Sequence, residues 1–134
     1  MIYNKIVVRY QDGRISKGAT NNFSPEKESF HLTFVNALPD TKPTKVILKD
    51  LKAVFFVKTF GGNPGYKDKN QFNDDKIVVH RKIKVTFKDG EVLMGTSYDY
   101  KRGSFGFFMF PADSQSNIER CFIISAATKE VSFI

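Results

Sequence analysis

The sequence has few of the residues from which catalytic and metal centres are usually built. Cys121 is the single cysteine, which excludes an intramolecular disulfide framework and any metal site made of several cysteines. The two histidines, His31 and His80, belong to no cluster with the spacing of metal ligands. An enzyme needs an acid, a base and a pocket that converge, and no motif supplies them. We therefore predict a protein that is not an enzyme and that uses no cofactor or metal.

Long apolar runs and helical periodicity are also missing. No segment approaches the roughly 18 to 20 consecutive apolar residues of a membrane span, so we predict no membrane contact. The first residues, Met1–Lys5, lead directly into a strand pattern without the basic and apolar regions of a signal peptide, which predicts a cytoplasmic location. Apolar residues nowhere keep a period of 3.6, so long helices are not expected.

Aromatic residues are abundant, although tryptophan is absent. Fourteen Phe and five Tyr make up 14% of the chain, a composition that favours strands. With 41% hydrophobic and 26% charged residues, the 134 residues suit one globular domain or two very small ones. The net charge is +7, divided as +4 in residues 1–57, +2 in 58–81 and +1 in 82–134. Such an excess either attracts a polyanion or forms a solvated face.

The chain repeats itself at an offset of 77 residues. The offset aligns similar residues without a gap: Ile6 with Ile83, Val8 with Val85, Gly18 with Gly95, Phe30 with Phe107, Ile47 with Ile124 and Lys52 with Lys129. A single register kept across turns and strands predicts a tandem duplication. The predicted organisation is a first β-repeat at residues 1–57, a connector at 58–81 and a second β-repeat at 82–134.

Within each repeat, apolar and polar residues alternate with a period of two, as in strands with one buried face. Asp12-Gly13 and Asp89-Gly90 follow the first strand of each repeat and predict type I′ hairpin turns, in which both residues have positive φ. Gly18 and Gly95 fall inside the returning strands, where glycine marks a bulge or a sharp bend. The short spacer before the last strand of each repeat predicts a single 3₁₀ turn.

Five short strands, an Asp-Gly hairpin and a 3₁₀-sized step before the last strand resemble the small SH3-like barrel. The first three strands are also similar to those of Sm-like domains. The resemblance implies an all-β fold of two tandem five-stranded SH3-like or Sm-like barrels, with or without shared strands, and one fused β-sandwich is the alternative. The acidic-Asn pair and the Arg-Gly step that mark RNA-binding Sm proteins are absent, so no residue is assigned to that activity.

Residues 48–66 and 81–91 are similar to a family of uncharacterised bacterial domains associated with PilZ and other signalling modules. The resemblance extends over the whole chain and implies a bacterial, cytoplasmic protein without a known activity. PilZ domains bind a cyclic dinucleotide through an Arg-x-x-x-Arg run and a later Asp/Asn-x-Ser-x-x-Gly motif. Neither motif occurs here, so no nucleotide-binding residue is carried over.

The connector is the part of the chain that the duplication leaves unexplained. Its interleaved basic and aromatic residues suit stacking on bases with phosphate pairing, or a lip that binds a peptide. The other interpretation is that its aromatic residues pin the connector onto the repeats while its lysines face solvent. The candidate binding residues are Lys58, Phe60, Asn63, Tyr66, Lys67, Lys69 and Arg81.

These observations predict a non-catalytic binding or regulatory module whose partner is a protein. The connector and the adjoining basic face of the first repeat would form the contact surface. The alternative is a nucleic-acid or nucleotide-binding domain that uses the same basic and aromatic residues. No pattern in the sequence specifies the ligand or the oligomeric state.

Overall fold

The computed structural model describes residues 3–72 and 80–134. The described elements are β1 (Asn4–Tyr10), β2 (Ile15–Thr20), β3 (Ser29–Phe34), β4 (Thr44–Ile47), η1 (Leu48–Asp50), β5 (Leu51–Val57), β6 (Arg81–Phe87), β7 (Val92–Ser97), β8 (Gly106–Pro111), β9 (Ile118–Ile124), η2 (Ser125–Ala127) and β10 (Thr128–Phe133). The ten strands form one antiparallel sheet, and the two η elements are single 3₁₀ turns. The predicted all-β fold and both predicted 3₁₀ turns are therefore confirmed.

The two halves of the sheet have the same internal strand order. The full order is β10-β6-β7-β8-β9-β5-β1-β2-β3-β4, so the path through β6 to β10 repeats the path through β1 to β5. The bounds of β1, β2, β3 and η1 recur 77 residues later in β6, β7, β8 and η2. Evolutionary duplication, SH3-like barrels and the predicted domain boundaries remain predictions.

One strand departs from this correspondence. β9 begins at Ile118, whereas β4 begins at Thr44, the position that the offset relates to Cys121. Pro43 precedes β4 at the position that Arg120 occupies in β9. Because proline has no N–H to donate to a neighbouring strand, it shortens β4.

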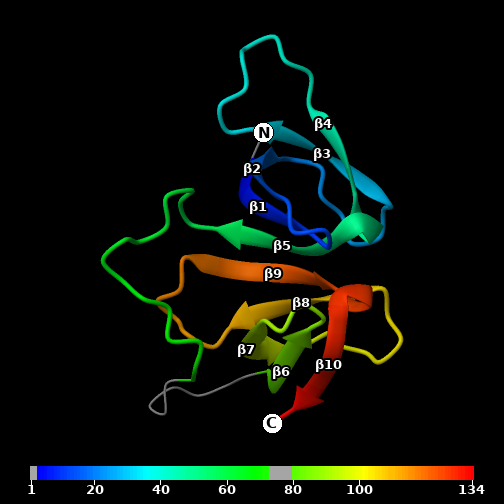
Figure 1. Ribbon diagram of the computed structural model, residues 1–134, viewed down its shortest axis with the longest axis vertical. Helices are drawn as coiled ribbons and strands as arrows, with labels where there is room; N and C mark the ends of the chain where they lie inside the picture. Colours follow the sequence, from blue (N-terminus) through cyan, green and yellow to red (C-terminus); the bar gives the residue numbers. More distant parts are fainter. Residues whose placement is uncertain (1–2, 73–79) are drawn as a thin grey trace.

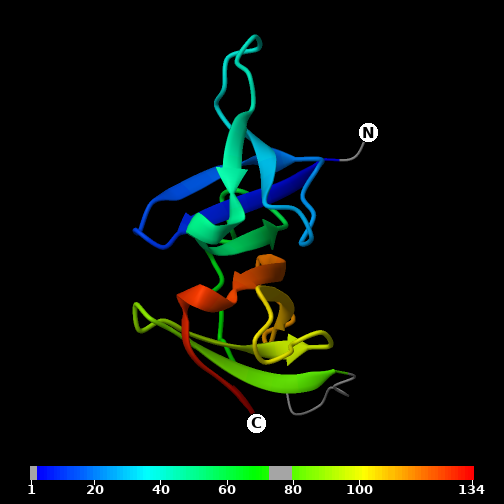
Figure 2. The ribbon, with the colours of Figure 1, turned by 90° about the vertical axis from the view of Figure 1, so that its right-hand side faces the viewer.

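The halves are joined by direct pairing of β5 with β9, which lie side by side at the centre of the molecule (Figure 1). The register places Ala53 opposite Ile123 and Val54 opposite Phe122. The view turned by 90° also shows the first half above the second, with the loop between β3 and β4 projecting away from both (Figure 2). The sheet is thus continuous across all ten described strands.

Two hydrophobic cores lie in the molecule, and each receives side chains from both halves. In β5, Val54 and Phe56 point into the first core, while Ala53 and Phe55 point into the second. The same alternation in β9 sends Phe122 and Ile124 into the first core, with Cys121 and Ile123 in the second. Because successive residues of a strand face opposite sides, each of these two strands serves both cores.

The hairpin turns differ from the predicted type I′ geometry. Gly13 and Gly90 have φ of 96° and 94°, but Asn70 is the one non-glycine residue at positive φ in the described part of the chain. In the first hairpin the Tyr10 N–H donates to Arg14 at 2.9 Å and the Gly13 N–H donates to Tyr10 at 3.1 Å. This is a three-residue loop with a left-handed glycine at its end. The prediction was wrong because the residue before each Asp-Gly pair also belongs to the loop.

Candidate functional site

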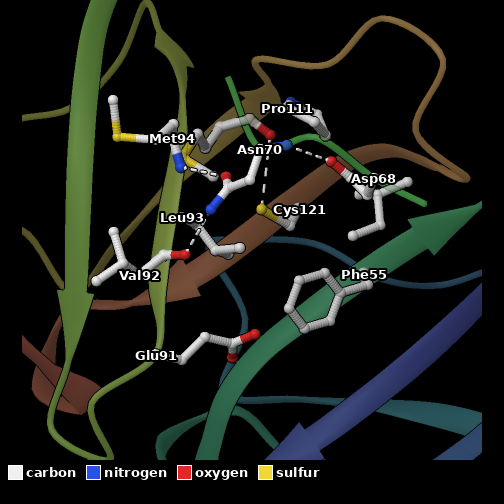
Figure 3. Close-up of a pocket in the computed structure, with 11 residues that line it drawn as sticks. Phe55, Asp68, Asn70, Glu91, Val92, Leu93, Met94, Pro111 and Cys121 are labelled. Carbon is white, nitrogen blue, oxygen red and sulfur yellow. Dashed lines mark hydrogen bonds between the residues drawn. The ribbon is translucent and has the colours of Figure 1, made fainter. Parts of the chain in front are cut away.

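A pocket lies where the two halves and the connector meet (Figure 3). Its volume is about 260 Å3. Its walls come from β5, β7, β8 and β9, and the connector closes one side. The lining residues are Phe55, Asp68, Asn70, Glu91, Val92, Leu93, Met94, Met109, Pro111, Ile118 and Cys121. We call this cavity the junction pocket.

The position of the junction pocket follows from the pairing of β5 with β9. Phe55 lies directly opposite Cys121 in that pair, and both side chains face the second core. Leu93 of β7 packs against the same core. The floor of the pocket is therefore the part of the second core that lies along the joint between the halves.

Polar groups stand at the rim of the pocket. The Asn70 side chain donates to the Val92 carbonyl at 2.9 Å and accepts from the Met94 N–H at 2.8 Å. The Asp68 carboxylate accepts from the Asn70 N–H at 2.8 Å. Asn70 has φ of 48°, a left-handed conformation that asparagine tolerates better than most residues. These bonds hold the connector against the outer end of β7.

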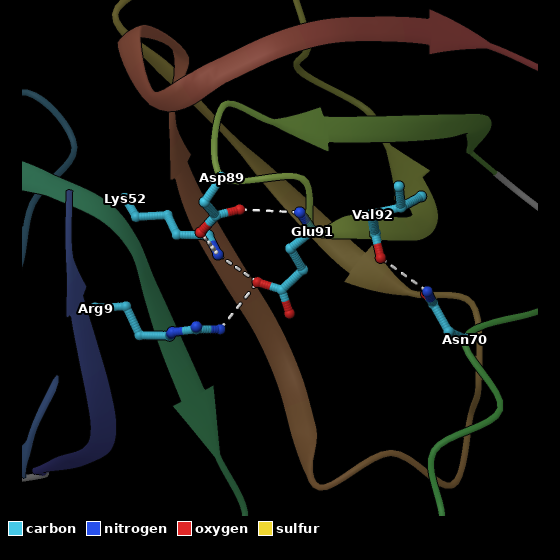
Figure 4. A network of polar contacts seen from close by, with 6 residues as sticks. All are labelled: Arg9, Lys52, Asn70, Asp89, Glu91 and Val92. Atoms are coloured by element: carbon cyan, nitrogen blue, oxygen red, sulfur yellow. Dashed lines mark hydrogen bonds and ion pairs between the residues drawn. The ribbon is translucent and has the colours of Figure 1, made fainter. Parts of the chain in front are cut away.

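Glu91 is fixed at the pocket by two cations from the first half (Figure 4). Its Oε1 accepts from Arg9 Nη1 at 2.9 Å and also from Lys52 Nζ. Lys52 reaches Asp89 Oδ2 at 2.7 Å and lies 4.5 Å from the centre of the Phe87 ring. Glu91 Oε2 accepts no hydrogen bond from a described residue.

The ion network lowers the pKa of one of its carboxyl groups, that of Asp89. The hydrogen bond from Lys52, together with the Glu91 N–H, holds the pKa of Asp89 below its usual value. Lys52 itself is only 4% exposed, whereas the side chains of Asp89 and Glu91 are half-exposed. The turn between β6 and β7 thus ties the second half to β5 as well as closing a hairpin.

Cys121 lies in the pocket wall as a buried thiol. Its Sγ is 3.6 Å from the Met109 carbonyl oxygen, and burial raises the pKa of the thiol to about 12. Since the thiolate is the nucleophilic form, Cys121 is unreactive near neutral pH. No group of three or more His, Cys, Asp or Glu residues in the described part of the chain is placed to hold a metal ion.

Two polar residues of the loop between β8 and β9 hold the connector. Asp113, which is 7% exposed, accepts hydrogen bonds from the Tyr66 hydroxyl and from the Lys69 N–H at 2.8 Å. Burial raises the pKa of Asp113, but hydrogen bonds from Lys69, Tyr66 and Gln115 outweigh that effect and leave the pKa below its usual value. The same bond to Asp113 raises the pKa of Tyr66 to about 12.

Asn117 forms the second attachment. Its side chain accepts from the Thr59 N–H at 3.1 Å and donates to the Thr59 carbonyl at 2.9 Å. Its backbone carbonyl accepts from the Lys58 N–H at 2.8 Å. Asp113 and Asn117 were not among the residues predicted for the site. The signal for them is a loop with Asp and Asn at spacings that suit capping of a neighbouring backbone.

The predicted binding residues do not all lie together. Phe60 packs against the second core, the Tyr66 hydroxyl is bonded to Asp113, and the Arg81 guanidinium lies 3.5 Å from the centre of the Phe133 ring. The remaining four are exposed: Lys58, Asn63, Lys67 and Lys69. The described part of the connector therefore presents its lysines to solvent. Its three aromatic residues contact the second half, since the Lys82 ammonium also lies 4.8 Å from the centre of the Phe72 ring. Residues 73–79 of the predicted connector lie outside the described residues.

The chain belongs to a family of unknown function (DUF6982), whose model matches residues 2–134. No curated protein and no solved structure matches it. None of the helical elements in the described residues has the length and hydropathy needed to cross a membrane.

Proposed function

We propose that this member of a family of unknown function is a non-catalytic binding module that holds a side chain of a protein partner in the junction pocket. The proposal rests on one observation: apolar walls from both halves meet beside a Glu91 oxygen that is free among the described residues. Binding sites commonly combine apolar walls with a few placed polar groups that set the orientation of the ligand.

The size of the pocket favours a side chain over a free small molecule. A volume of about 260 Å3 lies below the roughly 300–1,000 Å3 that is usual for small-molecule sites. One large apolar side chain fills a space of this size. A backbone N–H of the partner beside that side chain would donate to Glu91 or Asp68.

The chemistry of the lining supports binding without catalysis. The Cys121 thiol is protonated near neutral pH, and Asn70 already uses both ends of its amide to hold the connector. Glu91 Oε1 is occupied by Arg9 and Lys52. These residues are arranged to keep the pocket in shape.

The test compares three forms of the full chain as bait in a lysate of the source organism. Leu93→Arg places a charged side chain in the pocket, whereas Leu38→Arg makes the same change in the exposed loop between β3 and β4. We expect a protein that binds the wild type and Leu38→Arg equally and that binds Leu93→Arg at least tenfold more weakly in a titration with the purified partner. Capture that is equal for all three forms would refute the proposal.

The exposed connector lysines favour nucleic acid as the second candidate. Lys58, Lys67 and Lys69 form no ion pair with another described residue, and the chain carries a net charge of +7. We expect any binding of mixed-sequence oligonucleotides or cyclic dinucleotides to weaken steeply with salt and to be lost in Lys58→Ala/Lys67→Ala/Lys69→Ala. Absence of binding at low salt in a fluorescence titration would eliminate this candidate.

A further inference from the structure

The sheet ends at β4 with an edge that has no neighbour among the described strands. β4 pairs with β3 on one side, and it is the last strand in the sheet order. A free edge presents unpaired N–H and C=O groups to which another extended chain can bond. This edge is separate from the junction pocket, because none of the pocket residues belongs to β4.

A groove lies along the same edge. Its volume is about 420 Å3, and its lining residues are Glu28, Ser29, Lys45, Ile47, Lys49 and Phe105. Ile47 and Phe105 are 37% and 51% exposed, so two large apolar side chains face solvent in it. Lys45 and Lys49 form no ion pair with another described residue. The groove therefore combines two exposed apolar side chains with two lysines and one glutamate, and its lining carries a net positive charge.

The molecule contains its own example of how such an edge is filled. At the offset of 77 residues, β4 corresponds to the last four residues of β9, and the equivalent edge of β9 is paired with β5. Ala53 and Val54 of β5 lie opposite Ile123 and Phe122. Subtracting 77 from the β9 residue numbers transfers this pairing to β4. A strand added there in the same way would run antiparallel to β4, with one residue opposite Val46 and the next opposite Lys45.

The strand at the other end of the sheet, β10, also has a free edge, but it does not fit this position. At the offset of 77, Glu130 and Ser132 of β10 correspond to Ala53 and Phe55 of β5. A second copy that added β10 to β4 would place the Glu130 carboxylate on the face of the buried Val46, opposite to the face of Lys45. Burial of an unpaired carboxylate is costly, so the occupant must be a different segment.

We propose that an extended segment of a partner protein adds to the free edge of β4 as an antiparallel strand. Its main chain bonds to residues 44–47, an acidic side chain lies opposite Lys45, and an apolar side chain enters the groove between Ile47 and Phe105. Strand addition of this kind takes its affinity from main-chain hydrogen bonds and its specificity from alternate side chains. The lysines select against basic segments.

The test uses a fluorescein-labelled peptide, Glu-Glu-Leu-Val-Glu-Val-Thr, whose second Val lies opposite Thr44 in the expected register. Two control peptides replace each Glu by Lys or the first Val by Pro. We expect the acidic peptide to bind the full chain and the Lys and Pro peptides to bind at least tenfold more weakly. In ¹⁵N spectra the shifts should concentrate at residues 44–47 and Phe105, because alternate amides of an edge strand point outward.

Charge reversal supplies the matched protein variants. Lys45→Glu/Lys49→Glu should weaken binding of the acidic peptide at least tenfold and strengthen binding of the Lys peptide. Both changes lie at exposed positions, so the fold should be retained. Lys5→Glu/Lys84→Glu makes the same net change at two exposed strand positions and should leave both affinities within about twofold, because exposed charges this far away are largely screened. Leu93→Arg should leave the peptide affinity unchanged, which separates this surface from the junction pocket.

Three results would overturn the proposal. The first is no binding of the acidic peptide at about 1 mM, where even weak specific contacts are populated. The second is binding that does not respond to charge reversal or that shifts resonances away from β4. The third is self-association of the wild-type chain that Lys45→Glu abolishes, which would assign the edge to a second copy.

Discussion

At the scale of single residues, Lys52 is the cation that joins the first half to the hairpin of the second. It is buried, and its ammonium group contacts two carboxylates, Asp89 and Glu91, that belong to the turn between β6 and β7. Lys129, which the offset relates to Lys52, is exposed on β10. The equivalence of the two lysines in sequence therefore does not extend to their role.

Replacement of Lys52 by Met keeps the length of the side chain and removes its charge. We expect the free energy of unfolding to fall by about 1–3 kcal/mol, the usual cost of losing hydrogen bonds to charged groups, since the half-exposed carboxylates can regain water. Urea denaturation measures this loss, and NMR titration should show the pKa of Asp89 moving up toward its ordinary value. An unchanged Asp89 pKa in Lys52→Met would contradict the assigned contact.

Asp113 predicts a pH dependence of stability. Its pKa is lower in the folded chain than in the unfolded chain, so ionised Asp113 stabilises the fold above about pH 4, and that contribution is lost as the pH falls through the folded-state pKa. Asp113→Asn cannot ionise. We expect it to be about 1–3 kcal/mol less stable than wild type at pH 7, from loss of charge-assisted hydrogen bonds.

The difference in free energy of unfolding between wild type and Asp113→Asn should narrow as the pH is lowered below about 4, because the wild-type carboxylate then becomes protonated. Urea titrations at a series of pH values measure both curves. Asp68→Asn, at an exposed carboxylate of the connector, is the control and should follow the wild type more closely. Parallel curves for wild type and Asp113→Asn would show that Asp113 does not supply this pH dependence.

At the scale of strands, two glycines permit neighbouring strands to approach closely. A Cβ atom on Gly18 would overlap the carbonyl oxygen of Thr33 in β3, and one on Gly95 would overlap that of Phe110 in β8. Neither glycine has positive φ, so the constraint is the space beside the strand. The sequence predicted a bulge or a sharp bend at these glycines, but the β1–β2 and β6–β7 registers pass through Gly18 and Gly95 without a bulge.

Gly95→Ala should therefore be destabilising. The added methyl group meets backbone as well as the Met109 side chain at 2.8 Å, and we expect a loss of about 1–3 kcal/mol, the usual cost of overpacking. Gly61→Ala is the matched control, because a Cβ there has no atom within 4 Å and should change stability by less than about 0.5 kcal/mol. Equal melting temperatures for the two variants would contradict this packing argument.

Much of the strand structure could be predicted because its signals are local. Alternation identified Ile6 and Val8 as one buried face, and the two 3₁₀ turns followed from spacer length. The pairing of β5 with β9 could not be predicted, because no local pattern specifies which two edges of a sheet meet. The hairpin geometry was missed because the Asp-Gly signal does not set the length of the loop.

The same limit applies to the candidate site. The basic character of the connector is visible in the sequence, and Lys67 and Lys69 are indeed exposed. The junction pocket was missed because Phe55 and Cys121 become neighbours only when β5 pairs with β9. Glu91 was not among the predicted binding residues, since nothing near it in the sequence shows that Arg9 reaches across from β1.

At the scale of the whole molecule, the inner and outer edges of the halves differ in chemistry. The inner strands carry Phe55 and Phe122 on the faces that complete the core of the other half. At the offset of 77, the outer strands carry Ser132 and Lys45 instead. Polar residues on an edge strand oppose pairing with another sheet, so these outer edges are poorly suited to the joining that β5 and β9 achieve within one chain.

This contrast predicts that the outer edges can be converted into a joint. The variant Lys45→Phe/Glu130→Ala/Ser132→Phe places on β4 and β10 the residues found at Phe122, Ala53 and Phe55, and a head-to-tail contact of this kind forms rings or open filaments. We expect concentration-dependent assembly of this variant in sedimentation experiments. Lys45→Phe alone converts one edge and should sediment like the wild type, because both edges must be apolar. If the triple variant also sediments like the wild type, edge chemistry is not what limits self-association, and the correspondence of β4 with β9 does not extend to pairing.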